Sequence, residues 1–148
     1  MSALTVIGIG NRLYCDDGIG CKAVQRLCKE NLDRHVEYLV GETDIDYCLL
    51  HIHTRQVVLV DAVKAGCQPG SVHTYDPNEF LLVINNGFSM HNLHLLTLLN
   101  SVDNLNIRII GIEPYEVTLH AGLSYRMEES LDRIVQTINR MIQERIGL

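Results

Sequence analysis

The feature that most constrains the fold of this chain is a glycine-rich loop at residues 8–20, which reads GIGNRLYCDDGIG. A short β-rich run at residues 4–7 precedes the loop, and apolar residues recur every three or four positions from Ile19 onward. The loop therefore joins a strand to an amphipathic helix. A beginning of this kind is typical of α/β proteins, which bind ligands at the carboxyl ends of their strands.

The same alternation continues along the chain. Residues 57–60 are apolar on both faces, which predicts a central parallel strand covered by helices on each side. The patterns predict further strands at residues 36–40, 71–75 and 107–112, and helices at 18–31, after Thr43 or Asp44, at 90–100, and after Ser124. Helices and strands that alternate in this way build an open sheet with helices on both faces.

We therefore predict one domain over residues 1–148, with an α/β fold and a three-layer α/β/α sandwich. Its sheet is twisted, mostly parallel and five-stranded. Pro69-Gly70 makes a turn into residues 71–75, and the short connection allows that strand to be antiparallel. Residues 80–84 are apolar and precede a turn signal, so they predict either an edge strand or a flap over the site. Leucines surround the helix at 90–100, which predicts that it is largely buried.

Composition excludes several function classes. The formal charge of −6 argues against a nucleic-acid partner, because phosphate binding needs clustered Lys and Arg. No apolar run approaches the roughly 20 residues of a membrane span, and no signal-peptide pattern is present, so we expect a cytoplasmic protein without membrane insertion. The five cysteines are odd in number and form no Cys-x-x-Cys pair, as in reduced intracellular proteins. Cys15, beside two acids, is a candidate nucleophile that would need a nearby base.

Acidic residues meet at one edge of the predicted sheet. In the common strand order 2-1-3, Asp16 and Asp17 follow the first strand and Asp61 ends the third, so they converge on the crevice at the switch point. Three kinds of site fit this arrangement. A dinucleotide site is disfavoured, because Leu13 replaces the third glycine of the fingerprint and two acids would repel a phosphate.

A receiver-like domain also has an acidic pair and an aspartate at these places. It would have a Lys after the fifth strand, whereas this chain has Glu113-Pro114 there. The third kind of site is a metal centre. His91 lies in the first turn of the helix at 90–100, whose positive end favours a neutral imidazole, and His94 is the rival ligand one turn along. Asp17, Asp61 and His91 form an O, O, N set that suits nickel or zinc.

Five segments of the sequence resemble the hydrogenase maturation proteases, in the order that this family has them. They are Gly8-Ile9-Gly10-Asn11, Asp16-Asp17-Gly18-Ile19-Gly20, Val60-Asp61-Ala62, Ser89-Met90-His91 and Gly111-Ile112-Glu113-Pro114. The resemblance implies an endopeptidase that removes the C-terminal extension of a nickel–iron hydrogenase large-subunit precursor. It implies that Asp17, Asp61 and His91 grip nickel already inserted in that precursor, and that no organic cofactor takes part.

The sequence departs from the family pattern at three places. Asp17 stands where some members have Glu, Val40-Gly41-Glu42-Thr43 replaces Asp-Gly-Gly-Thr, and Met90 replaces a common Pro. The displaced acid Glu42 suggests a different precursor preference. The sequence leaves open the oligomeric state, the scissile bond, the roles of Glu42, Cys15 and His120, and whether nickel is catalytic or a recognition anchor. A non-catalytic metal- or nucleotide-binding α/β module is the alternative.

Overall fold

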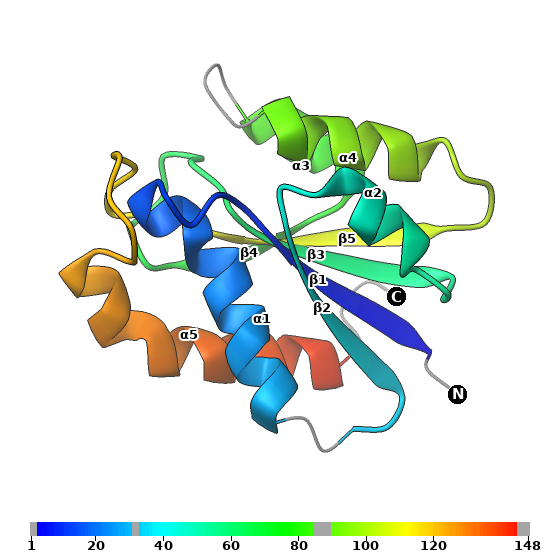
Figure 1. Cartoon of the computed structure of the whole chain (residues 1–148), viewed down its shortest axis with the longest axis horizontal. Coiled ribbons are helices and arrows are strands. Elements are labelled where there is room, and N and C mark those ends of the chain that lie inside the picture. The colour runs from blue at the N-terminus through cyan, green and yellow to red at the C-terminus, as the bar shows by residue number, and fades with distance from the viewer. Residues whose placement is uncertain (1–2, 31–32, 85–89, 145–148) are drawn as a thin grey trace.

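The structure is a computed structural model that describes residues 3–30, 33–84 and 90–144, without the side chains of residues 90–93. Its centre is a five-stranded sheet in the order β2-β1-β3-β5-β4, covered by helices on both faces (Figure 1). The strands are β1 (Leu4–Ile9), β2 (Val36–Glu42), β3 (Gln56–Ala62), β4 (Val72–Tyr75) and β5 (Asn106–Ile112). This arrangement confirms the predicted α/β sandwich.

The pairing of the strands also agrees with the prediction. The pairs β1–β2, β1–β3 and β3–β5 are parallel, whereas β4 runs antiparallel to β5. Gly8 of β1 lies opposite Val60 of β3, and Asp61 lies opposite Gly111 of β5. The carboxyl ends of β1 and β3 therefore lie side by side at the predicted switch point.

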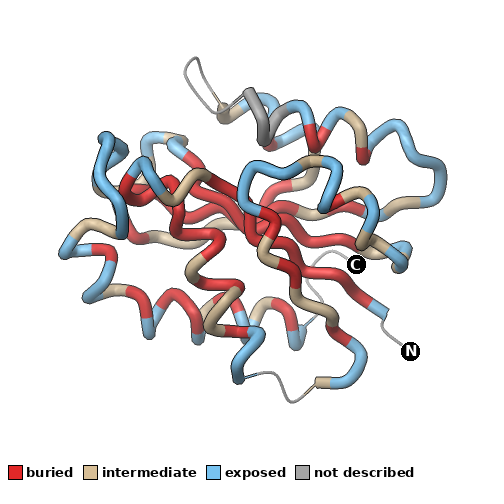
Figure 2. The backbone as a smooth tube through the Cα atoms, in the orientation of Figure 1, coloured by how far each residue is buried: buried red, intermediate tan, exposed pale blue. Residues whose placement is uncertain are grey.

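One face of the sheet is covered by α1 (Ile19–Glu30) and α5 (Tyr125–Gln143). Ser124 caps α5, because its hydroxyl accepts a hydrogen bond from the N–H of Met127, as the sequence predicted. The buried side chains of both helices pack on the sheet in one apolar cluster. Figure 2 shows the buried residues in red along the backbone. This core fixes the start of α1, and with it the loop that carries Asp17.

The other face is covered by α2 (Ile45–Leu50), α3 (Pro77–Val83) and α4 (Met90–Asn100). Asp44 caps α2 by accepting from the N–H of Tyr47, which settles the choice between Thr43 and Asp44. The edge strand predicted at residues 80–84 is wrong, because they belong to helix α3 and its end, whereas the alternative of a flap over the site stays a prediction. A capping box between Asp76 and Glu79, with a proline at the first turn, starts this helix.

Helix α4 is buried along one side only. Leu95, Leu96 and Leu99 pack on the sheet, while His94 and Thr97 are exposed. The prediction of a largely buried helix is therefore wrong for its outer side. The predicted turn at Asn85-Asn86-Gly87 lies outside the described residues.

The length and polarity of the helices bear on membrane insertion. In the parts of the chain that the structure describes, no helix combines the length and the apolar character that crossing a bilayer requires.

Candidate functional site

Asp17 lies in a short 3-10 helix, η1 (Cys15–Gly18), that connects β1 to α1. Its side chain is 8% exposed, and its Oδ2 accepts a hydrogen bond of 2.8 Å from the backbone N–H of Asn11. Gly10 has a φ of 134° and lies against the backbone carbonyl of Asp17, so no side chain fits at this position. The glycines of the loop thus allow η1 to lie directly over the end of β1.

The environment of Asp17 disfavours its charged form. Burial raises the pKa of the Asp17 carboxyl, and the N–H of Asn11 acts in the opposite direction. A carboxylate in such a place gains more from an approaching cation than an exposed one does, because less water screens the attraction. Asp17 therefore suits a metal ligand.

Asp61 lies near the end of β3 and is 1% exposed. Its position relative to Asp17 is set by Gly20, where a side chain would overlap the carbonyl oxygen of Val60. The start of α1 therefore packs directly on the end of β3. Element η1, which carries Asp17, contacts β3, which carries Asp61, so the structure brings both predicted acids to the same edge of the sheet.

His91 is the third predicted ligand. It belongs to the first turn of α4, but its side chain lies outside the described residues. Among the side chains that the structure describes, no group of three or more His, Cys, Asp and Glu residues is placed to hold a metal ion. The complete set of Asp17, Asp61 and His91 stays a prediction, and the exposed His94 lies on the outer side of the helix.

Cys21 lies close to Asp61, Arg12 and Glu42, each of which acts on the pKa of its thiol. Arg12 Nε is 3.5 Å from Glu42 Oε1, and the Cys21 thiol donates to the carbonyls of Gly8 and Gly10, each at 3.6 Å. Burial raises the pKa of Cys21 to about 12, although Arg12 acts in the opposite direction. Cys21 is thus a protonated donor. Sequence reasoning missed Arg12, because the residue lies outside any recognisable acid or ligand pattern.

Cys15 does not have the properties of a nucleophile. It is 2% exposed, and burial together with the neighbouring charge of Asp16 raises the pKa of its thiol. A nucleophilic cysteine needs the opposite, an environment that lowers the pKa and exposes the sulfur. The structure therefore argues against Cys15 as the catalytic group.

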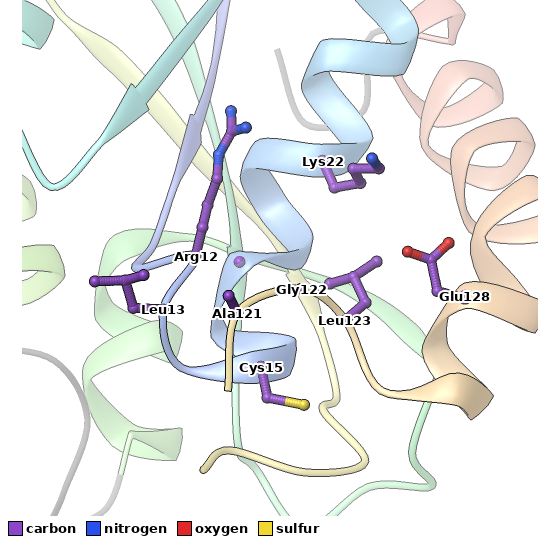
Figure 3. A pocket seen from close by; sticks show the side chains of 9 residues that line it. Arg12, Leu13, Cys15, Lys22, Ala121, Gly122, Leu123 and Glu128 are labelled. Carbon is purple, nitrogen blue, oxygen red and sulfur yellow. The ribbon is translucent and has the colours of Figure 1, made fainter. Parts of the chain in front are cut away.

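A pocket of about 240 Å³ opens beside the loop that carries Asp17. It lies between residues 12–18 and residues 121–123. The N–H of Cys15 donates to the carbonyl of His120, and the N–H of His120 donates to the carbonyl of Leu13, both at 2.9 Å. These bonds join the two loops. Lys22 of α1 and Glu128 of α5 lie at its rim (Figure 3). The remaining lining residues are Arg12, Leu13, Cys15, Gly18, Ala121, Gly122 and Leu123.

Two solved structures resemble this one in shape. Hydrogenase-maturating endopeptidase HybD of Escherichia coli superposes with a TM-score of 0.79 at 22% identity, covering 97% of this chain and 94% of the other. The [NiFe] hydrogenase maturation protease HybD of Thermococcus kodakarensis gives a TM-score of 0.74 at 23% identity, covering 94% and 98%. At these identities the two comparisons show a shared fold.

The sequence comparisons identify the family. A Methanocaldococcus jannaschii protein with the provisional name of hydrogenase maturation protease is 29% identical over 91% of this chain and 93% of its own length. The model of the family described as hydrogenase maturation protease matches residues 21–141, which is most of the chain. The chain therefore belongs to the hydrogenase maturation proteases, a family of endopeptidases.

Proposed function

We propose that this endopeptidase removes the C-terminal extension of a nickel–iron hydrogenase large-subunit precursor after nickel has been inserted. Asp17, Asp61 and His91 bind the nickel that the precursor carries, so the metal is part of the substrate and no organic cofactor takes part. The observation that supports this most is the placement of two buried acids, Asp17 and Asp61, at one edge of the sheet.

The donor chemistry fits a divalent ion of borderline softness. Two carboxylates and one imidazole leave coordination positions open for the precursor. A nickel ion held there can polarise a carbonyl or lower the pKa of a bound water. The ion is oriented by two buried carboxylates, that of Asp17 in η1 and that of Asp61 near the end of β3.

Under this proposal, the burial of Asp17 gives a physical reason for cleavage to wait for the metal. The low-dielectric surroundings raise the pKa of Asp17, and the approach of a cation favours its charged form. A precursor without nickel brings no cation and gains nothing from these acids. The enzyme therefore acts as a checkpoint for nickel insertion.

The pocket beside the loop supports a contact with the precursor. Its volume of about 240 Å³ is below the range of sites for drug-sized molecules and suits one side chain. Leu13 and Leu123 give it an apolar lining. We place one apolar side chain of the precursor there, and we place the reaction in the cytoplasm, where thiols stay reduced.

The alternative of a nucleotide-binding module has less support. A phosphate held by this loop would need free backbone N–H groups, as in other glycine-rich loops. The N–H of Asn11 already donates to the carboxylate of Asp17. The carboxylate occupies the place of the anion and repels it.

A direct experiment compares nickel-loaded and nickel-free precursor as substrates, and follows loss of the C-terminal peptide by mass spectrometry. We expect processing of the loaded precursor only, and loss of processing in Asp17→Ala, Asp61→Ala and His91→Ala. A matched control is His94→Ala, an exposed histidine of the same helix, which should keep full activity. Equal processing of both precursors would refute the role of nickel.

A further inference from the structure

Asp16 and Asp17 are neighbours with different surroundings. Asp16 is fully buried and its carboxylate accepts hydrogen bonds from a segment about 100 positions away in the sequence. Oδ2 accepts from the N–H groups of Tyr115 at 2.9 Å and Glu116 at 3.0 Å, and from the hydroxyl of Ser124 at 2.9 Å. Oδ1 accepts from the N–H of Ser124 at 2.8 Å. The bonds attach η1 to the connection between β5 and α5.

Asp17 has far fewer donors around it. Among the hydrogen bonds of the described residues, the one to its side chain comes from the N–H of Asn11. In a 3-10 helix, which has about three residues per turn, neighbouring side chains point about 120° apart. Fixing the direction of Asp16 therefore also fixes the direction of Asp17.

We propose that Asp16 is a positioning residue, which locks the rotation of η1 and so keeps the carboxylate of Asp17 in its place beside the N–H of Asn11. This inference rests on the proposed function, because it gives Asp16 a task in holding one of the three nickel ligands. One neighbouring acid anchors the loop, and the other binds the metal.

The backbone around Asp16 has its own attachments. The N–H of Asp16 donates to the carbonyl of Glu116 at 3.1 Å, and the N–H of Cys15 donates to that of His120 at 2.9 Å. These bonds do not involve the Asp16 side chain. The variant Asp16→Asn thus keeps the loops joined and loses the charged acceptor, so the rotation of η1 is the property that changes.

The amide of Asn11 reports the position of Asp17 without any enzymatic assay. Its N–H is bound to Asp17 Oδ2, so hydrogen exchange followed by NMR detects whether Asp17 stays in place. Asp16→Asn weakens the hydrogen bonds that hold η1, and hydrogen bonds to charged groups are among the stronger ones. Asp17 then moves away from the N–H of Asn11 more often, so we expect hydrogen exchange of the Asn11 amide to accelerate about tenfold or more. Amides in the centre of β1 and β3 should stay protected, and kcat on nickel-loaded precursor should fall about tenfold.

Glu113→Gln is the matched control. Glu113 is also a buried acid, and its Oε1 accepts from the N–H groups of Ala65 and Cys67, both at 2.9 Å, with no bond to η1 among the hydrogen bonds described. We expect faster exchange at Ala65 and Cys67, with Asn11 unchanged and kcat within about twofold. Ser124→Ala removes one of the donors to Asp16 and should give an intermediate effect at Asn11.

The outcomes separate this inference from the proposed function. Unchanged exchange at Asn11 in Asp16→Asn, or equal acceleration throughout the chain, would overturn the positioning role. The same loss of kcat in Glu113→Gln would overturn it too. Nickel-independent processing, in contrast, would remove the proposed nickel role and leave the exchange result for Asn11 standing.

Discussion

Gly20→Ala tests the close packing of α1 on β3, because two effects of opposite sign compete there. Gly20 is the second residue of α1, so alanine gains there at most the advantage over glycine of about 1 kcal/mol that it has in a helix interior. However, the new Cβ would overlap the carbonyl oxygen of Val60 and lie 2.8 Å from that of Ile9, and both are backbone atoms that cannot move aside cheaply. Overpacking of this kind costs about 1–3 kcal/mol, and a contact with backbone belongs at the upper end.

We therefore expect a net loss of about 1–2 kcal/mol in the free energy of unfolding. For a chain of this size, that corresponds to a decrease in Tm of roughly 3–8 °C, measured by circular dichroism. The substitution also pushes η1 away from the end of β3, so processing of the nickel-loaded precursor should fall more than stability alone explains.

Gly66→Ala is a suitable comparison for Gly20→Ala. Gly66 has a φ of 80°, and a Cβ added there would meet no atom within 4 Å, so the cost of the substitution comes from the backbone conformation alone, about 1 kcal/mol. This variant should lose stability and keep its activity. A Gly20→Ala protein with a higher Tm than the wild type would refute the reasoning, since helix propensity would then outweigh the contact.

Three further predictions concern other parts of the molecule. Because the folded state raises the pKa of Asp17, the charged carboxylate costs stability at pH values above the unfolded pKa, and this cost disappears as the pH falls below it. Asp17→Asn should therefore raise Tm at pH 7, and the gain should shrink towards acidic pH; a gain that grows on acidification would contradict this sign. Asp76→Ala removes the capping box of α3 and should cost about 1 kcal/mol, measured by urea unfolding, whereas the exposed Leu82→Ala should cost little. Ala121→Trp fills the pocket and should raise KM with kcat retained, while Leu119→Trp, an exposed change in the same loop outside the pocket lining, should leave KM unchanged.

The sequence predicted the sheet well, because its signals are local. Apolar residues on both faces at 57–60 indicate a covered strand, and the order of strands and helices then leaves few topologies for a parallel sheet. The convergence of Asp17 and Asp61 on one edge follows from that topology. The role of His91 stays a prediction, because its side chain lies outside the described residues.

Helix α3 shows how one strong local signal can hide another. The apolar run at 80–84 indicated a strand, but Asp76, Pro77 and Glu79 already have the pattern of a capping box with a proline at the first turn. The start of the helix could therefore be recognised in the sequence.

The role of Asp16 could not be recognised in the sequence. Its hydrogen-bond donors lie about 100 positions away and are largely backbone N–H groups, which nearly every residue provides.

Cys21, which lies at the start of α1 close to Asp61, is unsuited to bind a metal ion. Thiolates, rather than thiols, bind metal ions, and burial raises the pKa of Cys21 to about 12, so its sulfur stays protonated at neutral pH. The thiol donates instead to the carbonyls of Gly8 and Gly10, at the end of β1. Under the proposed function, Cys21 therefore does not compete with Asp17, Asp61 and His91 for the nickel of the precursor.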